Sequence, residues 1–239
     1  MDFPSLTKER WKFLKGLDNF NIMALEATHM RFALDLKDKY QVVDIEKYIV
    51  GSVYPDSRYV TGIDRTLTHG EWILADDFTV DDFHKGWQVH QLVDDIQAEI
   101  IKDYFPNLVP IFAKENKFTE REWPVFSAIK IIQDMDDLQK FDLRQSVKYL
   151  ENYVFNPNGE DIKKVQRYNQ IMINLYKGKK KTTVEDNYQM WLALGVDRKS
   201  ALNIKEQTEG LLKDVKMIKR IETIYDEMLR RFFKNKVNN

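Results

Sequence analysis

The sequence predicts an all-α protein, and two observations lead to that prediction. Only 9 glycines and 6 prolines interrupt its 239 residues, and the long stretches between them repeat apolar residues at the period of a helix. No segment alternates apolar and polar residues as a half-buried strand does. A chain of this length can bury a sizeable core, so we expect a multi-helix bundle.

The composition is that of a soluble globular protein and excludes several classes of function. The net charge is −1, from 37 basic and 38 acidic residues, whereas a dedicated nucleic-acid-binding protein needs a basic excess. No apolar run approaches the length of a membrane span, and the first residues contain no signal-peptide core, so we expect a cytoplasmic protein. Because cysteine is absent, metal ligands would have to be histidines and carboxylates.

The first half of the chain is expected to hold helices around one loop-rich segment. Helices are predicted over about 7–17 and 19–38, and Asp44 is a candidate N-cap of a short helix that Gly51 ends. Residues 51–80 then form a loop-rich stretch, long enough to suggest a functional role. A capping box formed by Thr79 and Asp82 starts a helix that Pro106 stops near residue 105.

The second half is expected to continue as helices that either pack on the same domain or form a small extension. We therefore divide the chain into a helical metal-site region, 1–140, and C-terminal helices, 141–239. The apolar spacing of the last helix predicts either a homodimer seam or packing onto the core. The predicted helices cover 107–115, 119–138, 142–154, 160–177, 183–193 and 198–235.

The segment FHKGWQVHQLVDDI, residues 83–96, holds the strongest candidate site. His90 and Asp94 stand four residues apart in a predicted helix, so both side chains project from one face. At about 100° per residue, this face is the centre of the apolar arc, and His84 falls outside it. A buried carboxylate must be neutralised, hydrogen-bonded or bound to a cation. The pair is therefore either part of a metal site or a His–Asp pair bonded to each other and to the backbone.

Three further segments extend this pattern: ATHMRFA (27–33), YIVGSVYPDSR (48–58) and LTHGEW (67–72). The resulting order is a helical His, a Gly-Ser…Pro-Asp turn, an isolated His and then Gly-x-x-x-His-x-x-x-Asp. This order resembles the bacterial zinc-dependent phospholipase C family, most of all its uncharacterised intracellular members. The match covers about residues 20–105, and the all-helical fold of that family agrees with the periodicity.

The resemblance implies that Asp56, His69, His90 and Asp94 bind one metal ion, with His29 beside it or near a second ion. Such ligands favour zinc, and iron or manganese also suits them. The implied activity is phosphoester hydrolysis, because such a metal lowers the pKa of a bound water and polarises a phosphoryl oxygen. Asp56, or a carboxylate that does not bind the metal, is the candidate proton acceptor.

The chain departs from the secreted members of that family in two ways. They use a mature N-terminal Trp as a ligand, whereas this chain begins Met-Asp-Phe. They also place further His and Glu ligands after the His-x-x-x-Asp helix, where this chain has no histidine. The site is therefore expected to hold one metal ion, or two with the help of His29, and phospholipase activity itself does not follow.

Each candidate also has a structural interpretation: His29 as a core histidine, Asp56 after Pro55 as a turn residue, and His69 as an ordinary loop residue. A phosphate substrate needs positive charge as well as a metal, and the candidates closest in sequence are listed here: Arg58, Arg65 and Lys85. The acidic segment IIQDMDDL, 131–138, is either a further source of ligands, as in the distantly similar HD-type metal phosphohydrolases, or a helix-end feature.

Two functions that use the His/Asp site therefore stay open, and a third possibility is an oligomer-forming helical protein with no metal. The first is a metal-dependent hydrolase of a small phosphoester. The second is a non-catalytic helical binding or scaffold protein whose His/Asp metal site is structural or vestigial. Neither function requires a nucleic acid or a membrane span.

Overall fold

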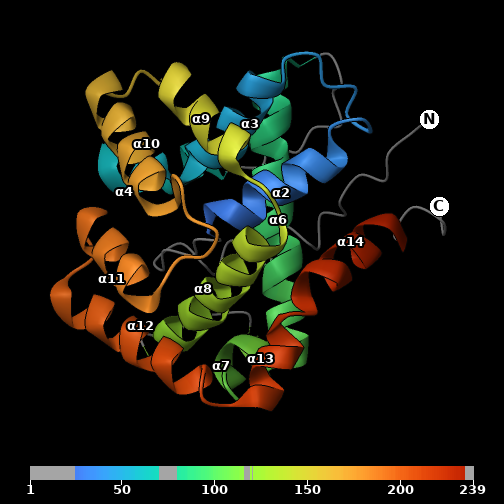
Figure 1. Ribbon diagram of the computed structural model, residues 1–239, viewed down its shortest axis with the longest axis vertical. Helices are drawn as coiled ribbons and strands as arrows, with labels where there is room; N and C mark the ends of the chain where they lie inside the picture. Colours follow the sequence, from blue (N-terminus) through green and yellow to red (C-terminus); the bar gives the residue numbers. More distant parts are fainter. Residues whose placement is uncertain (1–24, 70–79, 116–118, 120, 235–239) are drawn as a thin grey trace.

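Helix α6 (Asp82–Tyr104) runs through the middle of the molecule, and helices from both halves of the chain pack on it (Figure 1). The computed structural model describes residues 25–69, 80–115, 119 and 121–234. Every regular element in these ranges is a helix, so the predicted all-α class is confirmed. The predicted helix over 7–17 and the first part of the one over 19–38 lie outside the described residues.

Two helices of the first half frame α6. Helices α2 (Glu26–Leu36) and α3 (Ile45–Val53) pack on each other and on α6, and α2 also contacts α8 (Trp123–Lys140). The other elements, in chain order, are η2 (Tyr54–Ser57), α4 (Arg58–Thr61), α5 (Arg65–Thr68), α7 (Pro110–Glu115), α9 (Arg144–Asn152), α10 (Ile162–Tyr176), α11 (Val184–Ala193), α12 (Arg198–Leu211), α13 (Val215–Ile221) and α14 (Ile224–Lys234). The helices predicted between residues 107 and 193 are confirmed to within about one turn at each end.

Two glycines let α3 and α6 approach until their backbones touch. A Cβ on Gly51 would lie 2.0 Å from the carbonyl oxygen of Phe83, and a Cβ on Gly86 would lie 1.9 Å from that of Tyr48. Real Cβ atoms cannot approach a backbone oxygen so closely. Glycine at both positions is therefore what allows this pair of helices to pack directly against each other.

The ends of α3 and α6 partly match the prediction. Asp44 is confirmed as the N-cap of α3, because its side chain accepts a hydrogen bond from a backbone N–H of the first turn. The prediction that Gly51 ends this helix is wrong, since α3 continues to Val53 and Gly51 serves the contact with α6. Asp81 caps α6, whereas Thr79 lies outside the described residues.

The predicted loop-rich stretch over 51–80 is largely helical where the structure describes it. The 3₁₀ helix η2 and the one-turn helices α4 and α5 follow α3, and Gly62, with φ of 75°, separates α4 from α5. Helices of one turn are too short to show a hydrophobic period, so the sequence pattern does not reveal them.

Helix α8 holds the start of α2 through two buried carboxylates. Asp134 accepts hydrogen bonds from the backbone N–H groups of Ala27 and Thr28 at 2.8 and 3.2 Å, and it lies 3.1 Å from the hydroxyl of Tyr176. Asp137 accepts from the hydroxyl of Thr28 at 2.7 Å. These two aspartates of the acidic segment therefore neither converge on the histidines nor decorate a helix end; they fix α2 against α8.

The final helix predicted over 198–235 is three helices, α12, α13 and α14. Asp214 starts α13 by accepting hydrogen bonds from two backbone N–H groups. The apolar residues of this segment do not form one exposed surface. Tyr225 and Phe232 are buried in the core of this chain, whereas Val215 is 63% exposed. A continuous seam is therefore absent from the described helices, and the alternative, packing onto the core, is confirmed for α14, which contacts α6 and α8.

Replacing Gly86 by Ala is expected to destabilise the fold, because the new Cβ would meet the Tyr48 carbonyl oxygen at 1.9 Å. Overpacking of this kind lowers the free energy of unfolding by about 1–3 kcal/mol or more. The matched control is Gly210→Ala in α12, where a Cβ meets nothing within 4 Å. The control should gain up to about 1 kcal/mol, because alanine favours a helix. Chemical denaturation measures both, and equal stabilities would contradict the close helix contact.

The anchoring of α2 has a pH signature. Burial and the nearby Asp137 raise the pKa of Asp134 to about 8, so the folded protein keeps a proton there that the unfolded chain releases above about pH 4. Wild type should lose stability relative to Asp134→Asn as the pH rises from about 4 to 8, by up to about 1 kcal/mol per pH unit. Chemical denaturation of both proteins at several pH values measures the two stabilities. A wild type that instead gains stability relative to Asp134→Asn as the pH rises would show that Asp134 is ionised in the folded protein.

Candidate metal centre

Five side chains that the sequence singled out converge in the core. His29 comes from α2, Asp56 from η2, His69 from the end of α5, and His90 and Asp94 from α6. Their ligand atoms form overlapping groups that could hold a metal ion, and a further buried carboxylate, Glu26 of α2, belongs to one of these groups. His90 and Asp94 lie on the buried face of α6, as predicted, since they are 0% and 6% exposed.

The ring of His90 is oriented by the backbone of α3. Its Nδ1 lies 2.9 Å from the carbonyl oxygen of Ser52, and because that oxygen can only accept, Nδ1 carries the proton. The lone pair is therefore on Nε2, which faces the cluster. A metal-binding histidine typically donates such a hydrogen bond from the ring nitrogen that does not bind the metal.

His69 is oriented in the same sense by its neighbour in the chain. Its Nδ1 lies 2.8 Å from the hydroxyl of Thr68, which also lies 3.3 Å from the carbonyl oxygen of Arg65. Trp87 and Gln91 of α6 hold this segment, since both donate to the carbonyl oxygen of Thr68, at 2.6 and 2.9 Å. The Nε2 of His69 therefore faces the Nε2 of His90.

The two Nε2 atoms face each other at 3.3 Å, and that of His90 carries no proton, so the contact is a hydrogen bond when His69 carries its proton on Nε2. Two nitrogens that bind one tetrahedral zinc ion with bonds of about 2.0–2.1 Å are about 3.3 Å apart. Asp94 Oδ2 lies 3.6 Å from the Nε2 of His69 and 3.7 Å from that of His90. Asp56 lies 4.0 and 3.9 Å from the same two nitrogens. His90 thus belongs to two candidate ligand groups, one with Asp56 and His69 and one with Asp94 and His29.

Asp56 lacks the hydrogen bonds that a buried carboxylate normally has. It is fully buried, and neither oxygen has a hydrogen-bond partner among the described residues, although Arg58 Nε lies 3.8 Å from Oδ1. Burial and the charge of Asp94 raise the pKa of Asp56 to about 8. A cation bound between the carboxylates and imidazoles would relieve both the burial and the repulsion.

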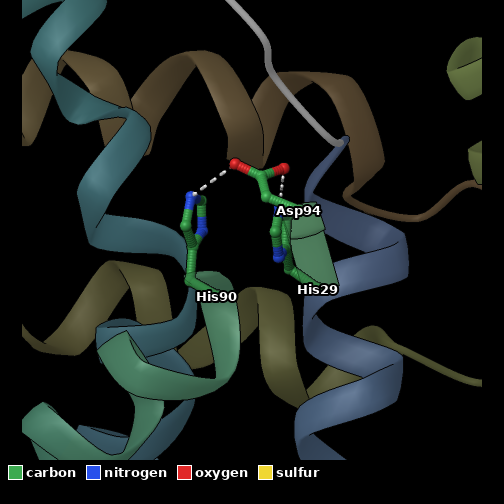
Figure 2. A group of neighbouring side chains, drawn as sticks. All are labelled: His29, His90 and Asp94. Carbon is green, nitrogen blue, oxygen red and sulfur yellow. Dashed lines mark ion pairs between the residues drawn. The ribbon is translucent and has the colours of Figure 1, made fainter. Parts of the chain in front are cut away.

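His29 lies beside His90 and faces the other oxygen of Asp94. Figure 2 shows the carboxylate at the edges of the two rings, with one oxygen toward His90 and the other toward His29, whose Nε2 is 3.8 Å from Oδ1. The His29 ring stacks on that of His90 with 3.9 Å between centroids. Neither nitrogen of His29 has a hydrogen-bond partner among the described residues.

Burial keeps the imidazoles neutral. It lowers the pKa of His90 to about 4 and holds the pKa values of His29 and His69 well below their ordinary range. For Asp94, burial acts to raise the pKa, but Lys130, His69 and His90 outweigh it and hold that pKa well below its usual range. Neutral imidazole and ionised carboxylate are the forms that bind metals.

Of the three cations predicted to bind phosphate, two lie near this cluster. Arg58 is close to Asp56 and stacks on the ring of Tyr59. Arg65 also lies near the cluster, because its charge is the second-largest cause, after the effect of burial, of the lowered pKa of His69. Lys85 is the exception, because its ammonium group binds Asp82 at 2.8 Å and the backbone of Gln41, not the cluster.

The fourth histidine lies outside the cluster, as expected. His84 contacts Asp81 at 3.0 Å, and its side chain is 36% exposed.

Two residues of the cluster do not follow from the sequence analysis, Glu26 and Lys130. Glu26 lies three positions before His29, on the same helix face, and accepts a hydrogen bond from Tyr168. Lys130 lies within the apolar segment SAIKII of α8 and reaches Asp94 Oδ1 at 3.6 Å. A lysine in the middle of an apolar helical run was the available signal, because such a residue must find a partner when buried.

No protein-family model, curated protein or solved structure matches this chain, so the resemblance to zinc-dependent phospholipases C stays a prediction. Among the described residues, no helix combines the length and the apolar character needed to cross a bilayer.

Proposed function

We propose that this protein is a metal-dependent hydrolase of a small phosphoester. One divalent metal ion, zinc or alternatively iron or manganese, is held by Asp56, His69, His90 and Asp94. The observation that carries the proposal is the convergence of two imidazole Nε2 atoms, 3.3 Å apart, with buried carboxylates, of which Asp56 accepts no hydrogen bond from a described residue. A cation shared by these groups would supply the partner that Asp56 lacks.

The proposed chemistry divides between the metal and the chain. When bound, a divalent metal lowers the pKa of a coordinated water and polarises a phosphoryl oxygen. Asp56 is the candidate proton acceptor, because its carboxylate lies beside the ligand nitrogens and accepts no hydrogen bond from a described residue. Arg58 and Arg65 supply positive charge near the ligands, which suits a substrate that carries phosphate.

A structural metal site is the second candidate, and one observation favours it. The side chains of His69 and Asp94 are only 6% and 7% exposed, so the cluster is nearly closed to solvent. In a structural site the metal would have a complete set of protein ligands and no open position for water. The protein would then be a helical binding or scaffold module.

Metal analysis tests both candidates against a metal-free core. Protein purified without chelator and loaded with zinc or manganese should retain about one equivalent after desalting, with a higher melting temperature than the metal-free form. Less than about a tenth of an equivalent after loading would contradict both the enzymatic and the structural proposal.

Replacing His90 by Ala separates the two candidates. An enzyme should lose turnover of a chromogenic phosphomonoester or phosphodiester by about 100-fold or more, with a modest fall in melting temperature. A structural site should instead lose much of its thermal stability. His84→Ala is the matched control, since this exposed histidine of the same helix binds Asp81 and lies outside the cluster. Wild-type protein that holds metal but hydrolyses neither ester would favour the structural site.

A further inference from the structure

Lys130 is a buried cation in this cluster that the proposed ligand set does not explain. Its side chain is 1% exposed, and its ammonium nitrogen lies 3.6 Å from Asp94 Oδ1 and 4.8 Å from the centre of the Phe126 ring. It makes no hydrogen bond to a described residue. An ammonium group has three N–H donors, and burying them without acceptors is costly. The ammonium group of Lys130 therefore has N–H donors available for an acceptor that is not part of the protein.

The two oxygens of Asp94 face different cations. Oδ2 lies 3.6 and 3.7 Å from the imidazoles that would share the metal ion, whereas Oδ1 faces Lys130 and His29. In a two-metal centre the second ion would sit beside Oδ1. Here a second ion would meet a positive charge at close range, in a setting where burial screens that repulsion weakly.

We propose that Lys130 is the second cation of a one-metal centre, and that its ammonium group binds a phosphoryl oxygen of the substrate. This inference rests on the proposed phosphoesterase function and adds a substrate-binding residue to it. A metal ion held by the two imidazoles would bind Oδ2, whereas the ammonium group faces Oδ1 of the same carboxylate. A phosphoryl group carries several negatively charged oxygens, so it suits two cations held side by side.

The position of Lys130 also distinguishes it from Arg58. Arg58 donates to the hydroxyl of Tyr59 at 3.0 Å and lies near Asp56, with its Nε 3.8 Å from Oδ1. Lys130 instead approaches from α8 and faces Oδ1 of Asp94, whereas Oδ2 faces His69 and His90. Charge from Lys130 thus reaches a bound phosphoryl group from a different direction, which favours a ligand with several negatively charged oxygens.

The test measures binding of inorganic phosphate to the zinc-loaded full-length protein by calorimetry, together with its metal content. Lys130→Met removes the charge and keeps the length of the side chain. It should keep the metal and lose phosphate affinity by about 10- to 100-fold, the usual effect of losing a hydrogen bond to a charged group. Lys130→Arg should retain part of the affinity. Lys140→Met on the same helix, whose side chain is 50% exposed and paired with Asp136, should change nothing.

Several outcomes would overturn the role of Lys130. Unchanged phosphate affinity in metal-loaded Lys130→Met would do so, as would about two metal equivalents in wild type. A fall in melting temperature and metal content without a selective loss of phosphate affinity would show a structural role instead. If Lys130→Met does not fold, Lys130→Gln is judged by the same criterion. Wild type that holds metal but binds no phosphate would overturn the phosphoester function itself, whereas phosphate binding that is insensitive to Lys130 would overturn this inference alone.

Discussion

The direct contact between α3 and α6 is the constraint on which the candidate centre depends. Because Gly51 and Gly86 bring the two backbones together, the carbonyl oxygen of Ser52 lies within 2.9 Å of His90 Nδ1 and sets the orientation of that ring. The same contact places the segment that follows α3 opposite the ring, so Asp56 comes within 3.9 Å of Nε2. Larger residues at the two glycines would separate the two helices and move the Ser52 carbonyl away from the His90 ring. The geometry of the site therefore depends on both glycines.

The buried carboxylates of this protein fall into two kinds, and the difference argues for a bound cation. Asp134 accepts two backbone hydrogen bonds and contacts a tyrosine hydroxyl, and Asp137 pairs with Arg31 at 2.7 Å. These groups are satisfied by the chain, as buried polar groups usually are. Asp56 is just as buried and accepts no hydrogen bond from the described residues. A fold that supplies partners for its structural carboxylates, and leaves this one unsatisfied beside three imidazoles, is arranged for a ligand at that point.

The sequence predicts local features of the site well and its convergence less well. His90 and Asp94 follow from helix geometry alone, because both lie on the apolar arc of one helix. Asp56, His69 and His29 come from other elements, so only the family resemblance grouped them, and their meeting depends on the packing of α2, η2 and α5 around α6.

The failures of prediction have local physical causes. Glycine often terminates helices, but at Gly51 the missing Cβ serves a helix contact. The C-terminal apolar period continues across Asp214, whose side chain caps a new helix and interrupts the old one. Lysine is normally a surface residue, although the apolar neighbours of Lys130 in α8 indicate burial.

The orientation of the imidazoles bears on whether the centre is organised before a metal binds. The ring of His90 has its proton fixed on Nδ1 by the Ser52 carbonyl of α3, and the Nδ1 of His69 lies 2.8 Å from the hydroxyl of Thr68, its neighbour in the chain. Both partners are held by helices, so neither ring can turn away from the cluster without breaking a hydrogen bond. Burial then keeps both rings neutral. Both oxygens of Asp56 meanwhile lack a hydrogen bond from a described residue, and an unsatisfied buried group held by a rigid frame is typical of a functional site.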